Sequence, residues 1–173
     1  MPLSLINLQQ ILINKNYQFS DIDVNLSNPD QLLKSDEYLI RIRADQLKED
    51  IQLKDWLLRL VVDIKTQTIV GHVGFHNKPN KEGMVEFGIT IGQSFKRNGF
   101  GQEAVRALCS WAINEDEVKL IRASVSPTNT ASLALISKLG LARIGEQNDE
   151  IDGLENIFQL SSNNFPVIDF TIN

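Results

Sequence analysis

The hydrophobic positions of the chain follow helical spacing in its first part. Apolar residues recur every three to four positions over 5–14 and again over 39–51, which predicts two amphipathic helices. Between them, Asn28-Pro29 predicts the start of a further helix, because Asn caps helices well and Pro suits the first helical turn. The polar residues 16–29 predict a loop. We therefore expect residues 1–55 to form a variable, helical N-terminal part.

From Trp56 onward the pattern changes to short apolar and β-branched runs, which are typical of strands. Such runs lie at 57–64, 69–76 and 84–91, and the polar turns between them predict an antiparallel meander. The elements expected after it are a helix over 101–114, a strand over 120–126, a helix over 129–139 and strands over 142–145 and 156–160. This order predicts an α/β (α+β) fold, with a mixed and mostly antiparallel central sheet flanked by helices.

Composition and charge narrow the class of protein. The 173 residues carry 17 Lys and Arg against 22 Asp and Glu, and the net charge of −5 argues against a nucleic-acid or anionic-membrane surface. The single cysteine excludes an intramolecular disulfide and a cysteine-based zinc site. No stretch approaches the roughly 20 apolar residues of a membrane span, and residues 1–16 lack the cationic lead of a secretory signal. We expect a cytoplasmic protein without a metal, nucleic-acid or membrane partner. Since no repeat or linker interrupts the chain, we expect a single domain over 1–173.

The most informative segment joins the third expected strand to the helix after it. Gly99 and Gly101 stand directly before this helix, so the backbone can turn and point several N–H groups outward together. These donors add to the positive end of the helix dipole, which suits a phosphate or pyrophosphate. Lys96 and Arg97 add positive charge. The alternative is a glycine-rich turn that binds no ligand.

Two common phosphate-binding motifs fit this segment poorly. A Walker-type loop needs Lys and then Ser or Thr after its last glycine, and Gln102-Glu103 stands there instead. A dinucleotide fingerprint would accept Gly99, Gly101 and Ala104, but it belongs in a parallel βαβ unit with an acidic residue ending the next strand. Residues 124–127 contain no acid, and the glycines follow an antiparallel meander.

A third family fits. The segment Lys96-Arg97-Asn98-Gly99-Phe100-Gly101 resembles the acetyl-CoA loop of the GNAT acetyltransferases, with Lys96 in place of the usual Gln or Arg. Further segments resemble the ribosomal-protein N-terminal acetyltransferases of the RimJ/RimL type: Val85 to Ile89, Gln102 to Leu108, Asn129 to Ser132 and Lys138 to Leu141. The resemblance covers residues 56–160, which would form the acetyl-CoA-binding core of a GNAT fold.

The resemblance implies direct transfer of an acetyl group from acetyl-CoA to a primary amine, without a covalent enzyme intermediate. The amine would belong to a protein N-terminus or to a small molecule. The strand over 84–91 is expected to separate from the strand over 120–126 and admit the pantetheine arm. The residues expected to bind the cofactor are Ile89, Ile91, Lys96, Arg97, Asn98, Gly99, Phe100, Gly101, Gln102, Glu103, Asn129 and Ser132.

Glu86 is the expected general base, acting through a water, because a carboxylate in a partly apolar strand can accept a proton near neutrality. The alternative is that Glu86 only hydrogen-bonds the loop or pairs with a cation. Asn129 stands at the expected N-cap position of a helix, so helix capping can account for this residue without a ligand. By spacing, Ile136 occupies the position where many GNAT enzymes have a Tyr acid. The general acid is therefore Ser132, a bound water, or absent.

The cysteine and the two histidines, which are residue types that often act in catalysis, have simpler structural explanations. We expect Cys109 to be a core thiol, and His72 and His76 to be surface or hydrogen-bonded side chains rather than to line an acceptor cleft. The competing function is a non-catalytic acyl-CoA-binding or regulatory module, suggested by Ile136 and by Leu141 in place of the usual Phe. The acceptor and the oligomeric state stay open, and a homodimer is compatible with the sequence.

Overall fold

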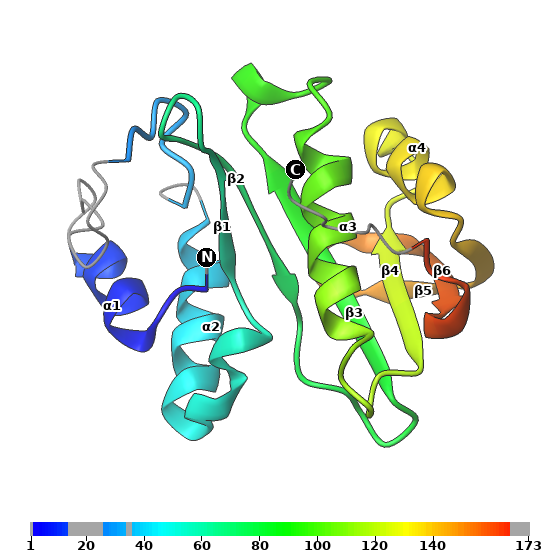
Figure 1. Ribbon diagram of the computed structural model, residues 1–173. Coiled ribbons are helices and arrows are strands. Elements are labelled where there is room, and N and C mark those ends of the chain that lie inside the picture. The colour runs from blue at the N-terminus through cyan, green and yellow to red at the C-terminus, as the bar shows by residue number, and fades with distance from the viewer. Residues whose placement is uncertain (1, 14–25, 34–35, 167–173) are drawn as a thin grey trace. The chain divides into compact units, whose positions relative to one another are not determined.

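The computed structural model describes residues 2–13, 26–33 and 36–166 of the chain (Figure 1). The chain forms two compact units. Unit 1 comprises Met1–Lys78 and Ile89–Phe100, and unit 2 comprises Pro79–Gly88 and Gly101–Asn173. The expectation of a single domain stays a prediction.

Unit 1 contains the predicted N-terminal helices and the first hairpin. Its elements are α1 (Leu5–Ile13), α2 (Glu37–Glu49), the 3-10 helix η1 (Ile51–Asp55), β1 (Arg59–Asp63), β2 (Thr68–Phe75), the end of β3 (Met84–Ile91) and the 3-10 helix η2 (Gln93–Phe95). β1 and β2 pair antiparallel from Arg59↔Val73 to Asp63↔Thr68. The predicted helices over 5–14 and 39–51 are therefore confirmed, and so is the first hairpin.

The core of unit 1 is apolar and comes from both helices and the hairpin. Leu8 of α1, Ile40 and Leu47 of α2, and Ile69 and Phe75 of β2 are at most 1% exposed. Burial of each such side chain contributes roughly 1.5–3 kcal/mol before the entropic cost of ordering is counted. Every residue of β2 is buried, because this strand is covered on both faces.

The helix predicted after Asn28-Pro29 is wrong. Turns occupy this stretch, and Gln31 and Leu33 have φ of 51° and 74°, which no right-handed helix accommodates. The Asn28 side chain stabilises the turn, since its Oδ1 accepts from the Leu32 N–H at 2.9 Å and its Nδ2 donates to the Leu32 carbonyl at 3.0 Å. Asn28 therefore caps a turn rather than a helix. Residues 16–25 of the predicted loop, and Asn14 at the end of the first predicted helix, lie outside the described residues.

Unit 2 contains the alternating helices and strands. Its elements are the start of β3, α3 (Phe100–Ala112), β4 (Leu120–Val125), α4 (Thr130–Leu139), β5 (Ala142–Asp149), β6 (Gly153–Ser161) and the 3-10 helix η3 (Ser162–Asn164). β3 pairs parallel with β4, whereas β4 with β6 and β5 with β6 pair antiparallel. The strand order is β1-β2-β3-β4-β6-β5. The predicted α/β class with a mixed, mostly antiparallel sheet is confirmed.

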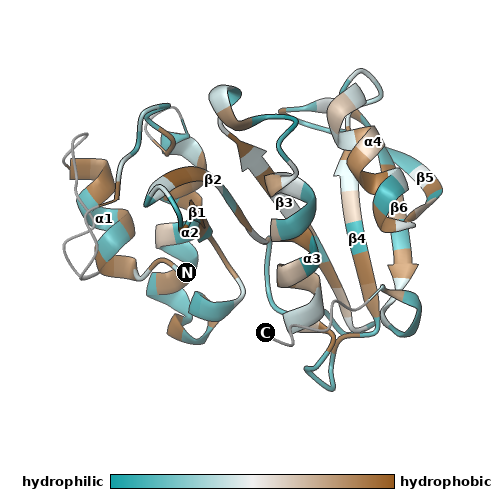
Figure 2. Ribbon diagram, turned by 45° about the horizontal axis from the view of Figure 1, so that its top comes forward, coloured by the Kyte–Doolittle hydropathy of each residue, from teal (hydrophilic) through white to brown (hydrophobic). Residues whose placement is uncertain are grey.

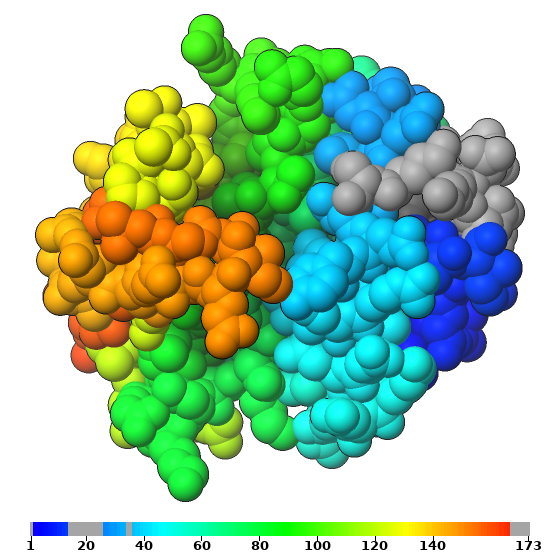
Figure 3. Space-filling view, turned by 180° about the vertical axis from the view of Figure 1, so that it is seen from behind, coloured from blue at the N-terminus to red at the C-terminus, as the bar shows by residue number. Residues whose placement is uncertain are grey.

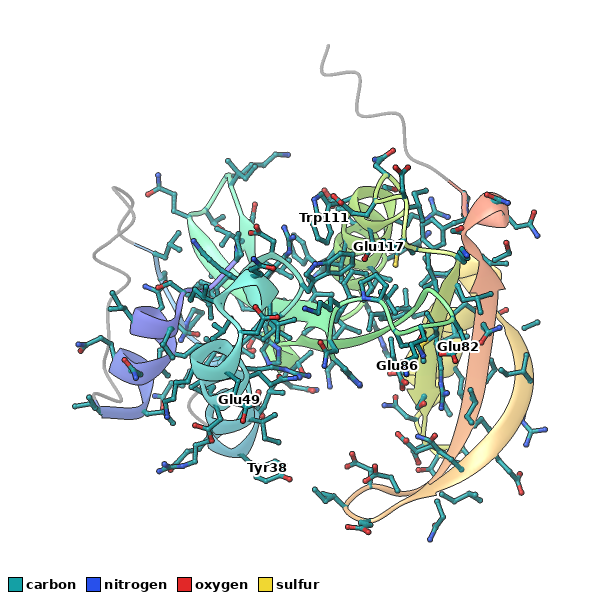
Figure 4. The ribbon with its side chains drawn as sticks, turned by 90° about the horizontal axis from the view of Figure 1, so that it is seen from below. Tyr38, Glu49, Glu82, Glu86, Trp111 and Glu117 are labelled. Carbon is teal, nitrogen blue, oxygen red and sulfur yellow. The ribbon has the colours of Figure 1, made fainter. Side chains whose placement is uncertain are left out.

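Buried and half-buried residues alternate along β4, and the colour of its ribbon changes with the hydropathy of these residues (Figure 2). Ile121, Ala123 and Val125 are buried, while Arg122 and Ser124 point to the opposite face and are half-buried. Figures 1 and 4 show α3 on one side of this part of the sheet. The buried face of α3 is made by Val105, Leu108, Cys109, Ser110 and Ala112. The polar face of β4 is therefore available for chemistry.

β5 and β6 form a longer hairpin than predicted, and its outer face lies at the molecular surface (Figure 3). β5 contains one extra residue: Arg143 pairs with Phe158 and Gly145 with Ile157, so Ile144 bulges out of the ladder. The bulge shifts the register beyond it by one position. As a result Gln147, and not Glu146, lies opposite Glu155.

Candidate functional site

The glycine-containing loop of the sequence analysis begins after β3 and runs directly into α3. Lys96, Arg97, Asn98 and Gly99 are exposed, and the helix starts at Phe100. Arg97 and Gly99 have φ of 67° and 87°. Left-handed residues close to a helix start turn successive backbone N–H groups toward one side, which is the geometry of an anion-binding nest. The local backbone therefore has the form that the motif predicts.

Asp30 anchors the start of this loop within unit 1. Its Oδ2 accepts from the Ser94 N–H at 2.9 Å, and its Oδ1 accepts from the Ser94 hydroxyl at 2.7 Å. These hydrogen bonds, the hydroxyl first, lower the pKa of Asp30 below its usual value. A Cβ on Gly92 would lie 2.5 Å from Asp30 Oδ2, so a larger residue there would displace the Asp30 carboxylate from its present position. The sequence analysis missed Asp30, because it is distant along the chain.

The loop fits a phosphate or pyrophosphate group. A Cβ on Gly99 would meet no atom within 4 Å, so the backbone there faces open space. The first N–H groups of α3 lack intrahelical acceptors, as at every helix start, and the dipole places positive charge there. Lys96 and Arg97 add two exposed cations. The donors are therefore of the kind that an anion needs.

A polar cluster lies on the open face of β4 in unit 2, and Glu86 of β3 is part of it (Figure 4). The Glu86 side chain is 17% exposed. Its Oε1 accepts from the Ser124 hydroxyl at 2.6 Å, and its Oε2 forms an ion pair with Arg122 Nε at 3.2 Å. Among the described residues, this Nε makes no aligned hydrogen bond. Glu86 therefore does pair with a cation, the alternative left open from the sequence.

Gln147 of β5 closes the cluster into a ring. Its Oε1 accepts from Arg122 Nη2 at 2.7 Å, and its Nε2 donates to Ser124 Oγ at 3.3 Å. The same Nε2 donates to Glu155 Oε2 at 3.0 Å. We call Glu86, Arg122, Ser124 and Gln147 the Glu86 ring. The sequence analysis named only Glu86; the alternation of Arg122 and Ser124 with apolar residues in β4 is the signal that could have found two others.

The parallel ladder between β3 and β4 ends at this ring. It runs from Met84↔Leu120 to Glu86↔Arg122, although β3 continues to Ile91 and β4 to Val125. Within the described part of unit 2, Phe87 and Gly88 have no partner in β4. Their backbone groups on that side are therefore not used by the β4 ladder, in agreement with the expected separation of the two strands.

Asn129 and Ser132 are brought together at the start of α4. Asn129 is the N-cap, and its Oδ1 accepts from the Ser132 N–H at 3.1 Å. Asn129 is exposed and Ser132 is half-buried, whereas Ile136 is 2% exposed in the core. The expected capping role of Asn129 is confirmed, and its contact with a cofactor stays a prediction.

Replacing Asn129 tests its role as the helix N-cap. Asn129→Ala is expected to lower the free energy of unfolding by about 1 kcal/mol, because the Ser132 N–H loses its acceptor. Asn129→Ser should keep most of that stability, since Ser is also a good N-cap. Urea unfolding measures both, with Thr130→Ala as the matched control next to the cap. Equal stability of Asn129→Ala and the unmodified chain would contradict the capping role.

Cys109 is a core thiol as predicted, and His72 is hydrogen-bonded, which agrees with one of the two expectations for the histidines. Cys109 is fully buried, and burial raises the pKa of its thiol. His72 is 3% exposed, and its Nε2 lies 2.9 Å from Asp36 Oδ2. Because a carboxylate only accepts, Nε2 carries the hydrogen. His76 is exposed at the end of β2, and its carbonyl accepts from Arg43 and Gln46.

The pair of His72 and Asp36 predicts an acid-sensitive contribution to stability. The hydrogen bond from His72 lowers the pKa of Asp36 below its ordinary value of 3.8. The stabilisation is therefore present above the ordinary pKa of 3.8 and is lost as the pH falls through the lowered pKa. Asp36→Asn should cost about 1 kcal/mol in urea unfolding at pH 6, and the difference should shrink below pH 3.8. If the difference in unfolding free energy between Asp36→Asn and the unmodified chain stays constant down to pH 3, the predicted acid sensitivity is contradicted.

The residues predicted to bind the cofactor are distributed over both units. Unit 1 carries the half-buried Ile89 and Ile91 and the loop residues 96–100. Unit 2 carries 101–103 at the start of α3, together with Asn129, Ser132 and Glu86. The described residues contain no group of three or more His, Cys, Asp or Glu side chains that could hold a metal ion. Nor does the described part include a helix long and apolar enough to cross a membrane.

Comparison with known families agrees with these local features. The family described as acetyltransferase (GNAT) domain matches residues 13–142. The chain therefore belongs to the GNAT acetyltransferase domain family. The resemblance argued from the segments between Val85 and Leu141 is confirmed at the level of the family.

Individual relatives are more distant. The uncharacterized N-acetyltransferase YjdG of Bacillus subtilis (strain 168) is 33% identical over 81 residues, which are 47% of this chain and 48% of that protein. The chain spans about half the length of the curated relatives it matches. A chimera of the spermidine N-acetyltransferase SpeG from Vibrio cholerae and hSSAT has a TM-score of 0.65 at 13% identity, over 94% of both chains. The ribosomal-protein-S5-alanine acetyltransferase from Vibrio fischeri has a TM-score of 0.65 at 14% identity, over 95% of this chain and 93% of that one. At these identities the structural likeness is one of fold alone.

Proposed function

We propose that the chain is an acetyl-CoA-dependent N-acetyltransferase that moves an acetyl group directly to a primary amine. The observation that carries the proposal is the exposed, cationic loop over 96–101. Its Arg97 and Gly99 have positive φ, and it leads into α3 in a member of the GNAT family. A glycine-rich turn with no ligand would need neither the exposed cations nor the open space at Gly99.

In this proposal the loop and the start of α3 bind the pyrophosphate of acetyl-CoA. Backbone N–H groups over 98–103 donate to it, and Lys96 and Arg97 add charge. Each charge-assisted hydrogen bond is worth on the order of 1.5–3 kcal/mol, so several together support micromolar binding. The pantetheine arm would pair with the backbone of Ile89 and Ile91 and approach Asn129 and Ser132.

Acetyl-CoA supplies the activated acetyl thioester, and its thiol is the leaving group. The amine nitrogen forms the new bond to the acetyl carbon as the carbon–sulfur bond breaks, so a proton on nitrogen must leave. Glu86 accepts that proton through a water, because it is a carboxylate held at the end of the β3–β4 ladder. Ser132 or a water protonates the departing sulfur; a thiolate is a tolerable leaving group, so a weak acid suffices.

The class of amine is the finer part of the proposal. Solved relatives of the same fold are described as acting on spermidine and on a ribosomal-protein alanine. We infer that the acceptor is likewise a primary amine, either a protein N-terminus or a small amine. Glu86 and Glu155 against Arg122 leave an excess of negative charge on the open face of unit 2, which tolerates a cationic acceptor.

One observation favours a second candidate, a non-catalytic acyl-CoA-binding module. Ile136 is buried where many GNAT enzymes carry an acidic hydroxyl, and it cannot donate a proton. Such a module would bind acetyl-CoA and acetylate nothing. The two functions therefore share the cofactor and differ in turnover.

A thermal-shift measurement followed by an amine screen tests both. Acetyl-CoA at about 100 times its Kd should add roughly 2.7 kcal/mol of stability, and NAD⁺ at the same concentration should add none. The screen then measures free thiol released with spermidine, lysine, and peptides that begin with Ala or Ser. Release with any amine supports the enzyme, and binding without release supports the module. No shift at millimolar acetyl-CoA would overturn both.

A further inference from the structure

The direction of each hydrogen bond in the Glu86 ring follows from which of its groups can only donate and which can only accept. Arg122 can only donate, and the Glu155 carboxylate can only accept. Gln147 must therefore present its carbonyl oxygen to Arg122 and its amide nitrogen to Glu155, which excludes the flipped amide. The same nitrogen faces Ser124 Oγ, so Ser124 accepts there and directs its single hydrogen to Glu86.

This arrangement holds Glu86 from two directions. Ser124 donates to Oε1 at 2.6 Å, and Arg122 lies 3.2 Å from Oε2. Turning the carboxylate would break one contact or the other. Gln147 contacts both of the side chains that hold Glu86, although it does not contact Glu86 in the described hydrogen bonds. Gln147 is in turn placed by the β5 bulge, which sets it opposite Glu155.

We propose that Gln147 is a positioning residue for acyl transfer: it orients Arg122 and Ser124, which hold the Glu86 carboxylate in the orientation that accepts the proton of the amine. The inference rests on the proposed function of Glu86. It adds that a side chain of β5, which β4 and β6 separate from β3 in the sheet order, governs the rate of proton removal. Acetyl-CoA binding, which the loop over 96–101 provides, does not depend on it.

Four variants test the role of Gln147. Gln147→Met keeps the length of the side chain and removes its donor and acceptor, while Ser124→Ala removes the hydroxyl and Ser124→Thr keeps it. Asn148→Leu is the matched control, because Asn148 is the next residue of β5 and is exposed on the other face. Thermal melts establish that each variant is folded. Rates are measured with the amine that gives the fastest thiol release in the screen.

We expect Gln147→Met and Ser124→Ala to lower kcat about tenfold, because Glu86 loses a group that holds it, while KM for acetyl-CoA changes less than about twofold. Ser124→Thr and Asn148→Leu should match the unmodified chain. A purely structural role would not give this split between kcat and KM, nor the rescue by threonine.

A second readout does not depend on turnover. The Arg122 guanidinium is followed by nitrogen-15 NMR, and the protection of its Nη2 hydrogens from solvent exchange should be lost in Gln147→Met and kept in Asn148→Leu. Normal kcat in Gln147→Met, in a chain that Glu86→Gln inactivates, would overturn the positioning role and leave the proposed function intact. Unchanged Arg122 protection in Gln147→Met would also overturn it. A chain that turns over no amine at all would overturn the proposed function and this inference together.

Discussion

Gly99→Glu is expected to weaken acetyl-CoA binding by about 100-fold or more while the chain stays folded. The added side chain meets no atom within 4 Å, so no steric clash opposes it. Its φ of 87° costs a side chain about 1–2 kcal/mol, which bends the loop away from the form that binds an anion. The carboxylate also places negative charge where the pyrophosphate would lie. Isothermal titration with acetyl-CoA measures the loss.

Two controls separate strain from charge in that result. Gly99→Gln has the same size and backbone strain without the charge, so its Kd should rise by only about tenfold. Gly153→Glu introduces the same residue at a φ of 74°, also with no atom within 4 Å, but in the β5–β6 turn. It should bind acetyl-CoA like the unmodified chain. Full affinity in Gly99→Glu would remove the loop from the cofactor site.

Glu86→Gln is expected to lower kcat by about 100-fold or more, because an amide cannot accept the proton that leaves the amine. The substitution keeps the size of the side chain and the acceptor for the Ser124 hydroxyl. Acetyl-CoA affinity should therefore change little, which calorimetry can check on the same sample. Steady-state release of free thiol measures kcat.

Glu82→Gln is the matched control, since Glu82 is an exposed carboxylate in the turn before β3 (Figure 4). It should keep normal turnover. If Glu86→Gln retains more than about a third of the kcat, Glu86 is not the base, and its ion pair with Arg122 is structural. Loss of acetyl-CoA binding in Glu86→Gln would point to the same conclusion.

The sequence predicts most elements of the fold because local patterns specify them. Buried and exposed positions alternate in β4, and the periodic apolar face of α3 is equally local. The hairpin of β5 and β6 was predicted too short, because most of its β5 residues are polar and exposed. The helix at Asn28-Pro29 was predicted wrongly, because the same residues also stabilise turns.

The two parts of the candidate site differ in how far sequence can predict them. Glycines and cations that lie close along the chain build the loop over 96–101, so its form could be predicted. The Glu86 ring joins residues from β3, β4 and β5, whose approach depends on strand register. Register depends in turn on the bulge at Ile144, and no sequence signal marked that position.

The extra residue in β5 decides which side chain of this strand lies opposite Glu155 and joins the Glu86 ring. If Ile144 paired with Ile157 instead of bulging, each later residue of β5 would lie one position further along β6 and its side chain would turn to the opposite face. Glu146 would then stand opposite Glu155, and an acid would replace the amide that donates to Ser124. Deleting Ile144 would instead remove the bulge and leave Gln147 opposite Glu155, so it is the unpaired state of this one residue that decides the hydrogen-bonding character of that face.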